Sequence, residues 1–401
     1  MARKTIFMVA ESQYPDDPRV FREAQYLQRN HRIFLLVLKN GPRKALERSE
    51  GVTVLRIPNI SKIGGLLQKI PFIGKLHYMV CYTYITLAAQ LVYLVTWPIY
   101  RYGFIHAHNP PDTYFVLGAM GKVLGSKFVF DVHDLSPELY ISRYPGRLGI
   151  IYKLLKTNEG WSCRMADMII TTNESYRDTL AARYEIEQGK IHIVRNDPDL
   201  DEYEMYDFSD TPKDHDRFIL LFIGAVNPQD GLGTLLEIIS ALVSEHGRDD
   251  IMLIVVGDGD ALPQCRDRVQ ELGIQDFVDF KGYIRERREI QKYLHMADIC
   301  LEPAPSNPVN DLSTFVKIME YMAARKPVVA FDLPESRKSA DDTAILIPPG
   351  DIARFTEAIL ELLEDKALRD RLGDMGFERI RNELNWQKSI LVLGEAYSSL
   401  T

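Results

Sequence analysis

The sequence is poor in cysteine and has no excess of positive charge. Its four cysteines form no C-x-x-C pair, so neither a zinc site nor a disulfide framework is expected, and reduced, packed thiols are the simpler interpretation. Lysine and arginine number 48 against 56 aspartate and glutamate, which gives a formal net charge of -8. Because no domain-wide basic field is available, nonspecific binding to nucleic acid is not expected.

Long apolar runs are also scarce. The run that follows the basic start MARK is too short for a signal peptide, and we expect it to form a first strand. The chain has 401 residues, of which 46% are hydrophobic and 26% charged, as in ordinary soluble globular proteins. At roughly 100–200 residues per domain, this length predicts two domains or three.

The chain does contain a regular alternation of short apolar runs and helical patterns, which is typical of parallel βαβ units. Most runs are dense in valine, isoleucine and phenylalanine, as expected of strands that are buried on both faces. The strands predicted in the first half are Thr5–Ala10, Ile33–Leu38, Val52–Ile57, Phe104–His108, Lys127–Val132, Met168–Thr171 and Ile191–Val194. Those predicted in the second half are Phe218–Ile223, Ile251–Val256, Phe277–Phe280, Asp298–Leu301, Pro327–Phe331 and Ala344–Ile347.

An acidic stretch, Asp197–Asp216, separates the two halves and is interpreted as an interdomain linker. The prediction is an α/β fold of two doubly wound Rossmann-like domains, residues 1–200 and 201–384, that face a central cleft in which ligands bind. Apolar residues at helical spacing near the end predict a last helix, about 385–401, that packs back on the first domain.

One stretch, Met79–Tyr100, has no charged residue and is just long enough to span a bilayer. Three interpretations remain open. A helix buried against the first sheet would tolerate its threonines and Gln90. A helix in the membrane interface fits the preceding segment, which mixes apolar residues with Lys69 and Lys75. A true span would put the flanking βαβ pattern on both sides of the membrane.

The strongest chemical signal lies in Asn307–Ala330 (NPVNDLSTFVKIMEYMAARKPVVA). Asp311 and Ser313 are good N-caps for a helix that runs from about Thr314 to Ala324. A helix start attracts anions because its backbone N–H groups are free. The N–H groups of Ser313 and Thr314 are therefore candidates for binding a diphosphate.

Ser313, Lys317 and Glu320 share one face of this predicted helix. A lysine one turn in adds a point charge for phosphate, and a glutamate one turn further can accept hydrogen bonds from vicinal hydroxyls, as on a ribose. This is the layout that a nucleotide needs. The alternative is a solvated polar stripe with an i, i+3 Lys–Glu pair. The following VVA strand and the expected cleft favour the functional interpretation.

The string EYMAARKPVVA at Glu320–Ala330 resembles the donor-site helix and following strand of the family 4 retaining glycosyltransferases of the GT-B fold. The resemblance covers nearly the whole chain and is greatest to a bacterial branch that builds polysaccharides on lipid carriers. It depends on further strings in the same order, which are HNPPD, DVHDLSPELY, TTNES, VRNDPDL, NPQDGLG, VGDGD and FDLPESRKSADD.

The resemblance implies that Glu320 holds the donor ribose, as the second glutamate of an E-x7-E motif whose first position is Leu312 here. Many relatives place an arginine and a lysine for the diphosphate within 225–230, and this chain has neither, so more of that charge is expected to come from Lys317. At Arg325 relatives usually have a glycine. A left-handed arginine would cost roughly 1 kcal/mol, so the helix is expected to end differently.

In the first domain, His133 follows the strand Phe128–Val132, and the resemblance implies that it contacts the donor sugar near the reacting carbon. An isolated histidine is more often structural, but a place at the carboxyl edge of a strand makes it a candidate. Asp134 and Glu138 flank it, either as acceptor-side residues or as groups that cap and pin the loop.

Two further loops are expected on the acceptor side. The loop after Phe104–Ala107 presents His108, Asn109 and Asp112, and two prolines hold it rigid. Arg19 follows the first βα loop. It either meets a phosphate of the donor or acceptor or is a surface arginine capped by an aspartate.

In the second domain, Gly257 and Asp258 follow a strand and predict a tight turn beside the nucleotide. The full G-x-G-x-x-G pattern is missing, so NAD is not expected. Tyr283 and Ile284 follow another strand, where the resemblance implies that the backbone contacts the nucleobase.

The resemblance thus implies a retaining glycosyltransferase that moves a sugar from a nucleotide diphosphate sugar, UDP-sugar rather than GDP-sugar, to a lipid-linked saccharide in exopolysaccharide, O-antigen or related glycan assembly. Lys317, helix N–H groups and Arg195 would stabilise the leaving diphosphate without a metal or another cofactor. The expected location is cytoplasmic and peripheral on the inner face of the cell membrane. The alternatives are a noncatalytic GT-B scaffold or partner subunit, which Leu312 would favour, and a nucleotide-sugar epimerase or a GT-B phosphorylase.

Overall fold

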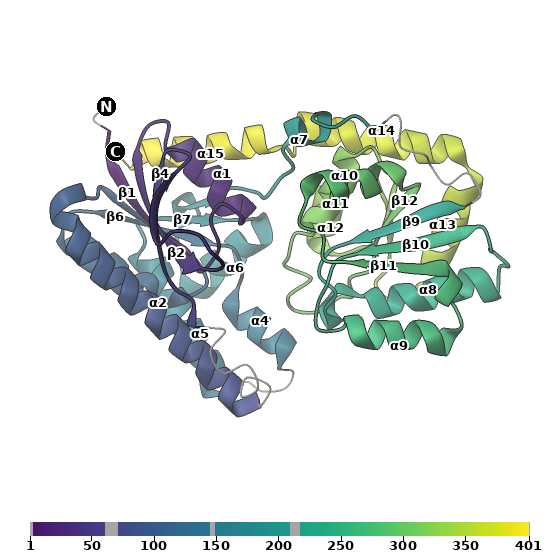
Figure 1. Cartoon of the computed structure of the whole chain (residues 1–401), viewed down its shortest axis with the longest axis horizontal. Helices are drawn as coiled ribbons and strands as arrows, with labels where there is room; N and C mark the ends of the chain where they lie inside the picture. The colour runs from purple at the N-terminus through teal and green to yellow at the C-terminus, as the bar shows by residue number, and fades with distance from the viewer. Residues whose placement is uncertain (1–2, 61–70, 145–148, 209–216, 401) are drawn as a thin grey trace. The chain divides into compact units, whose positions relative to one another are not determined.

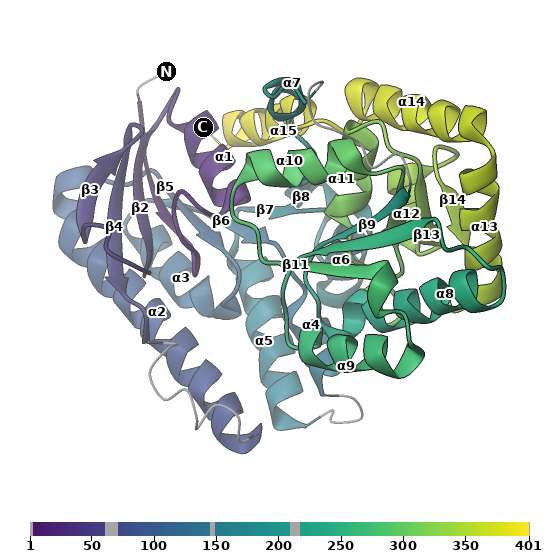
Figure 2. The ribbon, with the colours of Figure 1, turned by 45° about the vertical axis from the view of Figure 1, so that its right-hand side comes forward.

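The computed structural model describes residues 3–60, 71–144, 149–208 and 217–400. The chain divides into two compact units, unit 1 (Met1–Arg195 and Ile390–Thr401) and unit 2 (Asn196–Ser389). Each unit has a sheet of its own with helices on both faces (Figures 1 and 2). All four cysteines are free and buried, as expected.

The strands of unit 1 include every strand predicted in the first half of the chain, and one more. They are β1 Thr5–Val9, β2 Arg32–Lys39, β3 Leu46–Ser49, β4 Val52–Pro58, β5 Phe104–His108, β6 Lys127–Val132, β7 Met168–Thr171 and β8 Ile191–Ile193. They form a sheet in the order β3-β4-β2-β1-β5-β6-β7-β8, which is parallel except for the β3–β4 pair. The sequence pattern did not predict β3.

Helices cover both faces of this sheet. They are α1 Pro18–Leu27, α2 Pro71–Tyr100, η3 Asp112–Tyr114, α3 Phe115–Val123, α4 Ser136–Arg143, α5 Ile150–Met165, α6 Glu174–Tyr184, η4 Gln188–Lys190 and the end of α15 Trp386–Ser399. Successive residues of a strand point to opposite faces. In β5, His106 meets Tyr397 of α15, whereas Ile105 meets α3 at Gly121. Helix α15 therefore lies on one face and α3 on the other, where α2 and α5 also contact the sheet.

Unit 2 has a fully parallel sheet, again with every predicted strand present. Its strands are β9 Phe218–Ile223, β10 Ile251–Val256, β11 Val278–Gly282, β12 Ile299–Glu302, β13 Val328–Phe331 and β14 Ile345–Ile347, in the order β11-β10-β9-β12-β13-β14. Its helices are α7 Leu200–Glu204, η5 Pro228–Asp230, α8 Leu232–Ser244, α9 Leu262–Leu272, η6 Gln275–Phe277, α10 Arg287–Met296, α11 Val316–Ala323, α12 Pro334–Ala340, α13 Ile352–Glu364 and α14 Lys366–Asn382. One apolar core joins α8, α9 and α13 to the sheet, and a second joins α11 to its other face.

The segment predicted as a linker is partly folded onto unit 2. Its residues Leu200–Glu204 form α7, and Leu200 and Tyr203 pack against the core beside α11. The carbonyl of Pro198 accepts a hydrogen bond of 2.9 Å from the backbone N–H of Trp386, where α15 begins. Residues 209–216 lie outside the described part of the chain.

Helix α2 has two apolar faces. One packs on the sheet through Cys81, Ile85, Ala89 and Tyr93, and the ring centres of Tyr93 and Phe7 lie 5.3 Å apart. The other face is exposed and consists of Leu87, Leu91, Leu94, Val95 and Ile99. Residues 79–100 are long and apolar enough to cross a membrane, but only 28% of their most apolar window is buried. Lys69 and the side chain of Lys75 lie outside the described part of the structure.

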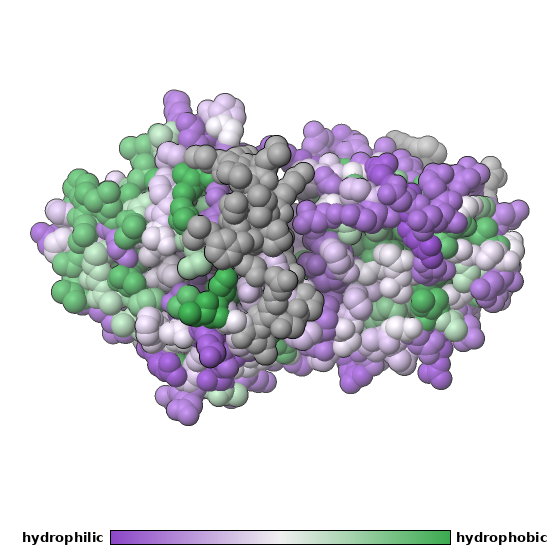
Figure 3. Space-filling model, turned by 90° about the horizontal axis from the view of Figure 1, so that it is seen from below, coloured by the Kyte–Doolittle hydropathy of each residue, from purple (hydrophilic) through white to green (hydrophobic). Residues whose placement is uncertain are grey.

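Exposed apolar side chains of the described residues gather on one side of unit 1, and Figure 3 shows hydrophobic residues in green on this unit, at the left. All but four of the large ones lie on α2, α3, α4 and α5; the four exceptions are Leu46, Met205, Tyr283 and Leu391. Large apolar patches on soluble proteins usually mark an interaction surface.

Candidate active-site residues in the two units

The strand order of each sheet reverses once, between β1 and β5 in unit 1 and between β9 and β12 in unit 2. Ligands of doubly wound sheets bind at such points, outside the carboxyl ends of the strands. The structure places His108 and His133 at the ends of β5 and β6, close to the reversal in unit 1. It places Lys317 beside β9 and β12, at the reversal in unit 2.

Lys317 points from α11 toward the ends of β9 and β12. Its Nζ lies 2.8 Å from Oε2 of Glu302, the last residue of β12, and 4.4 Å from the ring centre of Phe222. Glu302 is buried, and burial raises the pKa of its carboxyl group while Lys317 lowers it. The ammonium group therefore faces the sheet at its reversal, and the solvated-stripe alternative is wrong.

Two glycines let the loop after β9 approach this lysine and let the loop after β10 pack against that loop. Gly224 follows β9 with φ +152, and a Cβ atom there would lie 3.1 Å from Nζ of Lys317. Gly257 follows β10 with φ +148, and a Cβ atom there would overlap the carbonyl oxygen of Gly224. Both positions need glycine, because L side chains rarely adopt this backbone conformation. The predicted tight turn at Gly257 thus lies against the loop that touches Lys317.

The start of α11 differs from the prediction. The helix begins at Val316, and its N-cap residue Phe315 makes no side-chain capping bond. The three residues expected at the helix start bond elsewhere: Ser313 Oγ to Val309 O at 2.8 Å, Asp311 Oδ2 to Ser306 Oγ at 3.0 Å, and Thr314 Oγ1 to Glu335 Oε2 at 3.4 Å. Asp311 and Ser313 are therefore not N-caps. The N–H of Ser313 donates to Asn310 O, so it does not remain free for a phosphate.

Glu320 lies one turn beyond Lys317 and is partly buried. Its Oε1 is 2.8 Å from Nη1 of Arg287 in α10. Arg287 also donates to Glu202 Oε2 at 2.9 Å and to the hydroxyl of Tyr203 at 3.2 Å. Burial lowers the pKa of Arg287, but Glu320, Tyr203 and Glu202 raise it by more, so the cation is retained. Arg287 thus fixes the Glu320 carboxylate at the edge of the candidate site.

The other unit 2 residues that were predicted to bind the donor lie in loops at the same edge of the sheet. Asp258 is exposed, and its Oδ1 accepts from the N–H of Gly259 at 2.8 Å. Tyr283 follows β11 with 74% of its surface exposed, while Ile284 packs against the core. An exposed tyrosine at a carboxyl strand end is available for stacking.

Arg325 takes the left-handed conformation that was expected to be avoided. Its φ is 56°, directly after the end of α11, so the helix ends as it would with a glycine. The guanidinium group lies 2.6 Å from Asp374 and 3.7 Å from the ring centre of Phe377, both in α14. These contacts offset the strain of roughly 1 kcal/mol for a left-handed residue.

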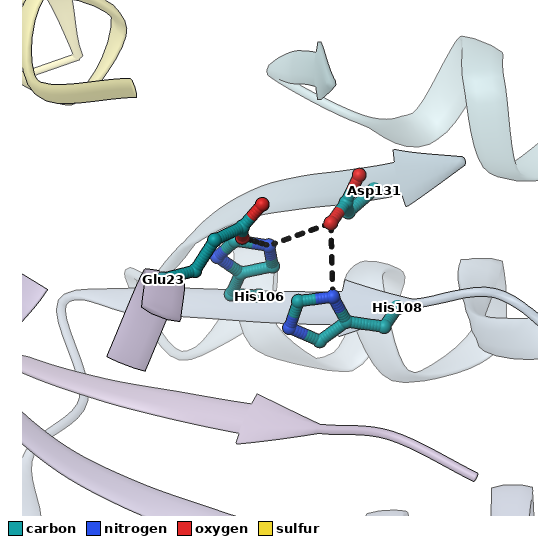
Figure 4. A group of neighbouring side chains, drawn as sticks. All are labelled: Glu23, His106, His108 and Asp131. Carbon is teal, nitrogen blue, oxygen red and sulfur yellow. Dashed lines mark hydrogen bonds and ion pairs between the residues drawn. The ribbon is translucent and has the colours of Figure 1, made fainter. Parts of the chain in front are cut away.

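In unit 1, a buried cluster of ionisable side chains has Asp131 at its centre (Figure 4). Oδ2 of Asp131 lies 2.9 Å from Nδ1 of His108 and 3.0 Å from Nε2 of His133. Arg19 binds the same carboxylate through two nitrogens, at 3.0 and 2.8 Å. Burial would raise the pKa of Asp131, but Arg19 and His133 outweigh it and hold the pKa well below its usual range. A permanent carboxylate thus orients His133.

Glu23 and His106 extend this cluster toward the C-terminal helix (Figure 4). Oε2 of Glu23 lies 3.4 Å from Nε2 of His106, whose Nδ1 is 2.8 Å from the hydroxyl of Tyr397. Burial and the charge of Asp131 raise the pKa of Glu23 well above its usual value, and burial lowers the pKa of His106. The raised pKa of Glu23 and the lowered pKa of His106 both favour the neutral forms of these two side chains.

Arg19 is not a surface residue, and that alternative is wrong. It is buried, and in addition to its two bonds with Asp131 it donates through Nη1 to the carbonyl of Val194 at 2.7 Å. Its Nη2 also lies 3.2 Å from Glu23. Because each of its nitrogens donates inside the protein, we now assign Arg19 to the support of Asp131.

The three residues predicted in the loop after β5 lie inside unit 1 and support His133. His108, Asn109 and Asp112 are all buried. Oδ1 of Asn109 accepts from the backbone N–H of His133 at 2.6 Å, and its Nδ2 donates to Asp112 at 2.9 Å and to the carbonyl of Asp134 at 2.7 Å. Burial raises the pKa of Asp112 to about 6. These residues position His133.

The last three predicted residues have separate roles. Asp134 is partly exposed beside His133, and burial raises the pKa of its carboxyl group. Glu138 forms an ion pair with Arg183 of α6, which favours the interpretation that it pins the loop. Arg195 forms an ion pair with Glu174 at the start of α6. Its guanidinium is thus engaged within unit 1.

Glu23, His106, His108 and Asp131 offer ligand atoms within 4.8 Å of one another, a set that could hold a metal ion. Arg19, however, contacts both carboxylates of the set. A divalent cation would have to displace this guanidinium group or lie against it. We therefore interpret the cluster as an ion-pair and proton network.

Two family patterns match this chain in succession. Residues 19–202 match the family described as "Glycosyltransferase Family 4", and residues 217–365 match "Glycosyl transferases group 1". The chain belongs to these glycosyltransferases. An alpha-D-kanosaminyltransferase of Streptomyces kanamyceticus is 23% identical over 67% of this chain and 70% of its own length. A phosphatidyl-myo-inositol mannosyltransferase of Mycobacterium leprae is 30% identical over 40% of this chain and 41% of its own length.

The fold of this glycosyltransferase is GT-B, as expected. The crystal structure of Anabaena Alr3699/HepE in complex with UDP superposes with a TM-score of 0.71, covering 99% of this chain and 100% of that chain at 15% identity. Each unit contributes one sheet covered by helices, and the strands are parallel except for the β3–β4 pair, as the GT-B fold requires of its two domains.

Sequence reasoning missed several residues of this glycosyltransferase: Glu23, His106, Gly224, Arg287 and Glu302. Glu302 ends a strand that was predicted, so the rule that placed His133 at a strand end could have found it. Gly224 likewise follows a predicted strand. Asp131 begins the string DVHDLSPELY, which was used only for the family resemblance. Glu23 lies four residues after Arg19, an i, i+4 spacing that could have paired the two on a helix. For His106 and Arg287 the sequence held no signal, because their partners lie far away along the chain.

Proposed function

We propose that this glycosyltransferase moves a sugar, with retention of the anomeric configuration, from a UDP-sugar to a hydroxyl group of a lipid-linked saccharide. The observation that supports this most is the pair Lys317 and Glu320 on one helix beside the reversal of the unit 2 sheet. A cation near a glycine loop suits a diphosphate, and a carboxylate one turn further suits ribose hydroxyls. In this proposal, unit 2 binds the donor, and unit 1 binds the acceptor and contributes His133.

The proposed reaction is a front-face displacement. The bond from the anomeric carbon to the diphosphate breaks as the acceptor oxygen bonds to the same carbon, and the acceptor proton passes to the leaving phosphate. Negative charge grows on the diphosphate, and Lys317 with backbone N–H groups at the start of α11 would stabilise it. These groups would replace a metal ion. His133, oriented by Asp131, would contact the sugar.

Two relatives support the choice of substrates. Alr3699/HepE was crystallised with UDP, which favours a uridine nucleotide over GDP. The mannosyltransferase of M. leprae is named for a lipid acceptor, phosphatidyl-myo-inositol. An acceptor of this kind is met at a bilayer surface, so we further propose that the enzyme lies on the cytoplasmic face of the membrane and serves polysaccharide assembly.

The test is incubation of the enzyme with radiolabelled UDP- and GDP-sugars and a membrane lipid extract, with and without EDTA. We expect label from a UDP-sugar to enter the lipid fraction, equally in both conditions. Free labelled sugar without lipid product would indicate a hydrolase or epimerase. The absence of turnover with every donor, despite UDP binding, would favour the noncatalytic scaffold.

Replacing Glu320 with alanine is expected to weaken UDP binding by about 2 kcal/mol, the size of a hydrogen bond to a charged group. Glu320→Gln keeps an acceptor oxygen and should lose less. The fold should survive in both variants, since Arg287 keeps its bonds to Glu202 and Tyr203. Calorimetry with UDP measures the loss, and unchanged affinity in Glu320→Ala would remove the ribose assignment.

The exposed face of α2 is expected to hold the enzyme on anionic membranes. Leu87, Leu91 and Val95 are 58%, 63% and 65% exposed, so changing all three to serine should leave the fold intact. Each would lose roughly 1 kcal/mol of apolar burial, so vesicle binding should fall by about 100-fold.

Liposome flotation with phosphatidylglycerol vesicles measures this effect. A matched triple variant, Leu46→Ser/Met205→Ser/Leu391→Ser, alters exposed apolar residues outside α2 to α5 and should float like the wild type. If both triple variants float as well as the wild type, α2 does not bind the membrane.

A further inference from the structure

A pocket of about 190 Å³ opens in unit 1 between α2, α4 and α5. Its walls are mainly apolar and include Met79 of α2, Leu139 of α4, and Ile151 and Leu155 of α5. Three tyrosines complete them. Two polar side chains, Asp134 and Ser136, lie in its lining. The pocket is therefore amphipathic, and apart from the tyrosine hydroxyls its polar groups come from one short segment.

The polar end adjoins the histidine that we assign to the reaction. Asp134 directly follows His133, and Asn109 ties both residues together by accepting from their N–H groups at 2.6 and 3.3 Å. Pro110, next to Asn109, also lines the pocket. A molecule whose polar end lay at Asp134 would thus have that end beside His133.

The apolar end continues into the exposed apolar surface of unit 1. Met79 is 43% exposed and begins the uncharged stretch of α2. On α5, Ile150 and Leu154 are 76% and 43% exposed beside the pocket residues Ile151 and Leu155. A chain of carbon atoms could leave the pocket along this surface without crossing a charged side chain of its lining.

The charge of the lining decides which polar group fits. Among the described residues that line the pocket, there is a carboxyl group at Asp134 and neither lysine nor arginine. A phosphate at this end would meet a carboxylate with no compensating cation, whereas a sugar or glycerol hydroxyl could donate to Asp134 and Ser136. Tyrosine rings beside it suit a sugar face.

We propose that this pocket binds the hydrocarbon chain of the acceptor where it joins an uncharged, hydroxyl-bearing group held by Asp134 and Ser136. This inference rests on the proposed function and narrows it to glycolipid acceptors that have no phosphate beside the chain, unlike the phosphatidyl-myo-inositol for which the M. leprae enzyme is named. The exposed face of α2 would then bind the bilayer surface, while the pocket would bind the one lipid molecule that accepts the sugar.

Calorimetry with n-octyl-β-D-glucoside below its micelle concentration tests the pocket without donor or turnover. We expect it to bind at least about tenfold more tightly than methyl-β-D-glucoside, and more tightly than n-octyl phosphate. Met79→Asp/Leu139→Asp should abolish the preference for the octyl chain, and both positions are more than a third exposed, so the fold should persist. The control Leu87→Asp/Leu91→Asp changes α2 outside the pocket and should keep the preference.

Asp134→Asn should raise the affinity for n-octyl phosphate relative to n-octyl-β-D-glucoside. Three results would each overturn the inference. The wild type could show no preference for the octyl chain, the control variant could lose that preference as fully as the pocket variant, or the wild type could bind n-octyl phosphate more tightly than n-octyl-β-D-glucoside. If octyl glucoside binds in the pocket but the enzyme transfers no sugar, the proposed function is wrong and the pocket inference is kept. If the enzyme transfers sugar to lipid but octyl glucoside does not bind, the pocket inference is wrong and the proposed function is kept.

Discussion

Lys317→Met is expected to lower kcat/KM for sugar transfer by about 10²–10³-fold, the usual effect of removing one group that stabilises charge in a transition state. Affinity for UDP should fall by much less, because the lysine acts mainly as the bond to the leaving diphosphate breaks. Steady-state kinetics measures kcat/KM, and calorimetry measures the affinity for UDP. Equal losses in both would indicate that Lys317 only binds the donor.

The ion pair with Glu302 offers a sharper control, since Lys317→Met also leaves a buried carboxylate without its partner. The double variant Lys317→Met/Glu302→Gln removes that charge as well. If Lys317 acts on the diphosphate, the double variant stays as slow as the single one. Recovery of activity in the double variant would mean that the lysine serves only to neutralise Glu302.

Asp131→Asn is expected to destabilise the protein by about 3–5 kcal/mol, the usual cost of removing one partner of a buried ion pair. Arg19 would lose the carboxylate that binds two of its nitrogens in the interior, and burial raises the pKa of Glu23, its other acidic neighbour. His108 and His133 would lose their common acceptor. Urea unfolding at pH 7 measures the loss, and any folded fraction should transfer sugar more slowly.

Glu23→Gln is the matched control, since it changes the other carboxyl group that touches Arg19. The pKa of Glu23 is raised in the folded state, so its contribution to stability is full below the unfolded pKa near 4.5 and declines as the pH rises. At pH 7 the glutamine should therefore be tolerated within about 1 kcal/mol or be stabilising. A loss as large as that of Asp131→Asn would assign the negative charge to Glu23.

The sheets could be predicted from the sequence because their strands are buried on both faces and read as unbroken apolar runs. Strand β3 could not, since its sequence is LERS and its residues are at most partly buried at the sheet edge. The start of α11 was misjudged for a local reason. Asn307 accepts from the N–H groups of Val309 and Asn310, which forms a turn that delays the helix.

Candidate site residues could be predicted where they follow the end of a strand, as His133 and Gly257 do, or share a helix face at regular spacing, as Lys317 does with Glu320. Their partners were not predictable in the same way. Arg19 and Asp131 lie 112 residues apart, and no local pattern distinguishes a buried arginine from an exposed one. Similarly, Arg287 and Glu320 meet only because α10 and α11 lie on the same face of one sheet.

The hydrogen bond between His106 and Tyr397 joins residues 291 positions apart. On the ribosome, at about 5–20 residues per second, the tyrosine is made roughly 15–60 s after the histidine. All of unit 2 is synthesised within that interval. Unit 1 is thus begun first and completed last. Until α15 is synthesised, the buried cluster around Asp131 lacks the contact of His106 with Tyr397. A nascent chain released before Tyr397 would carry a complete unit 2 joined to a unit 1 that lacks the end of α15.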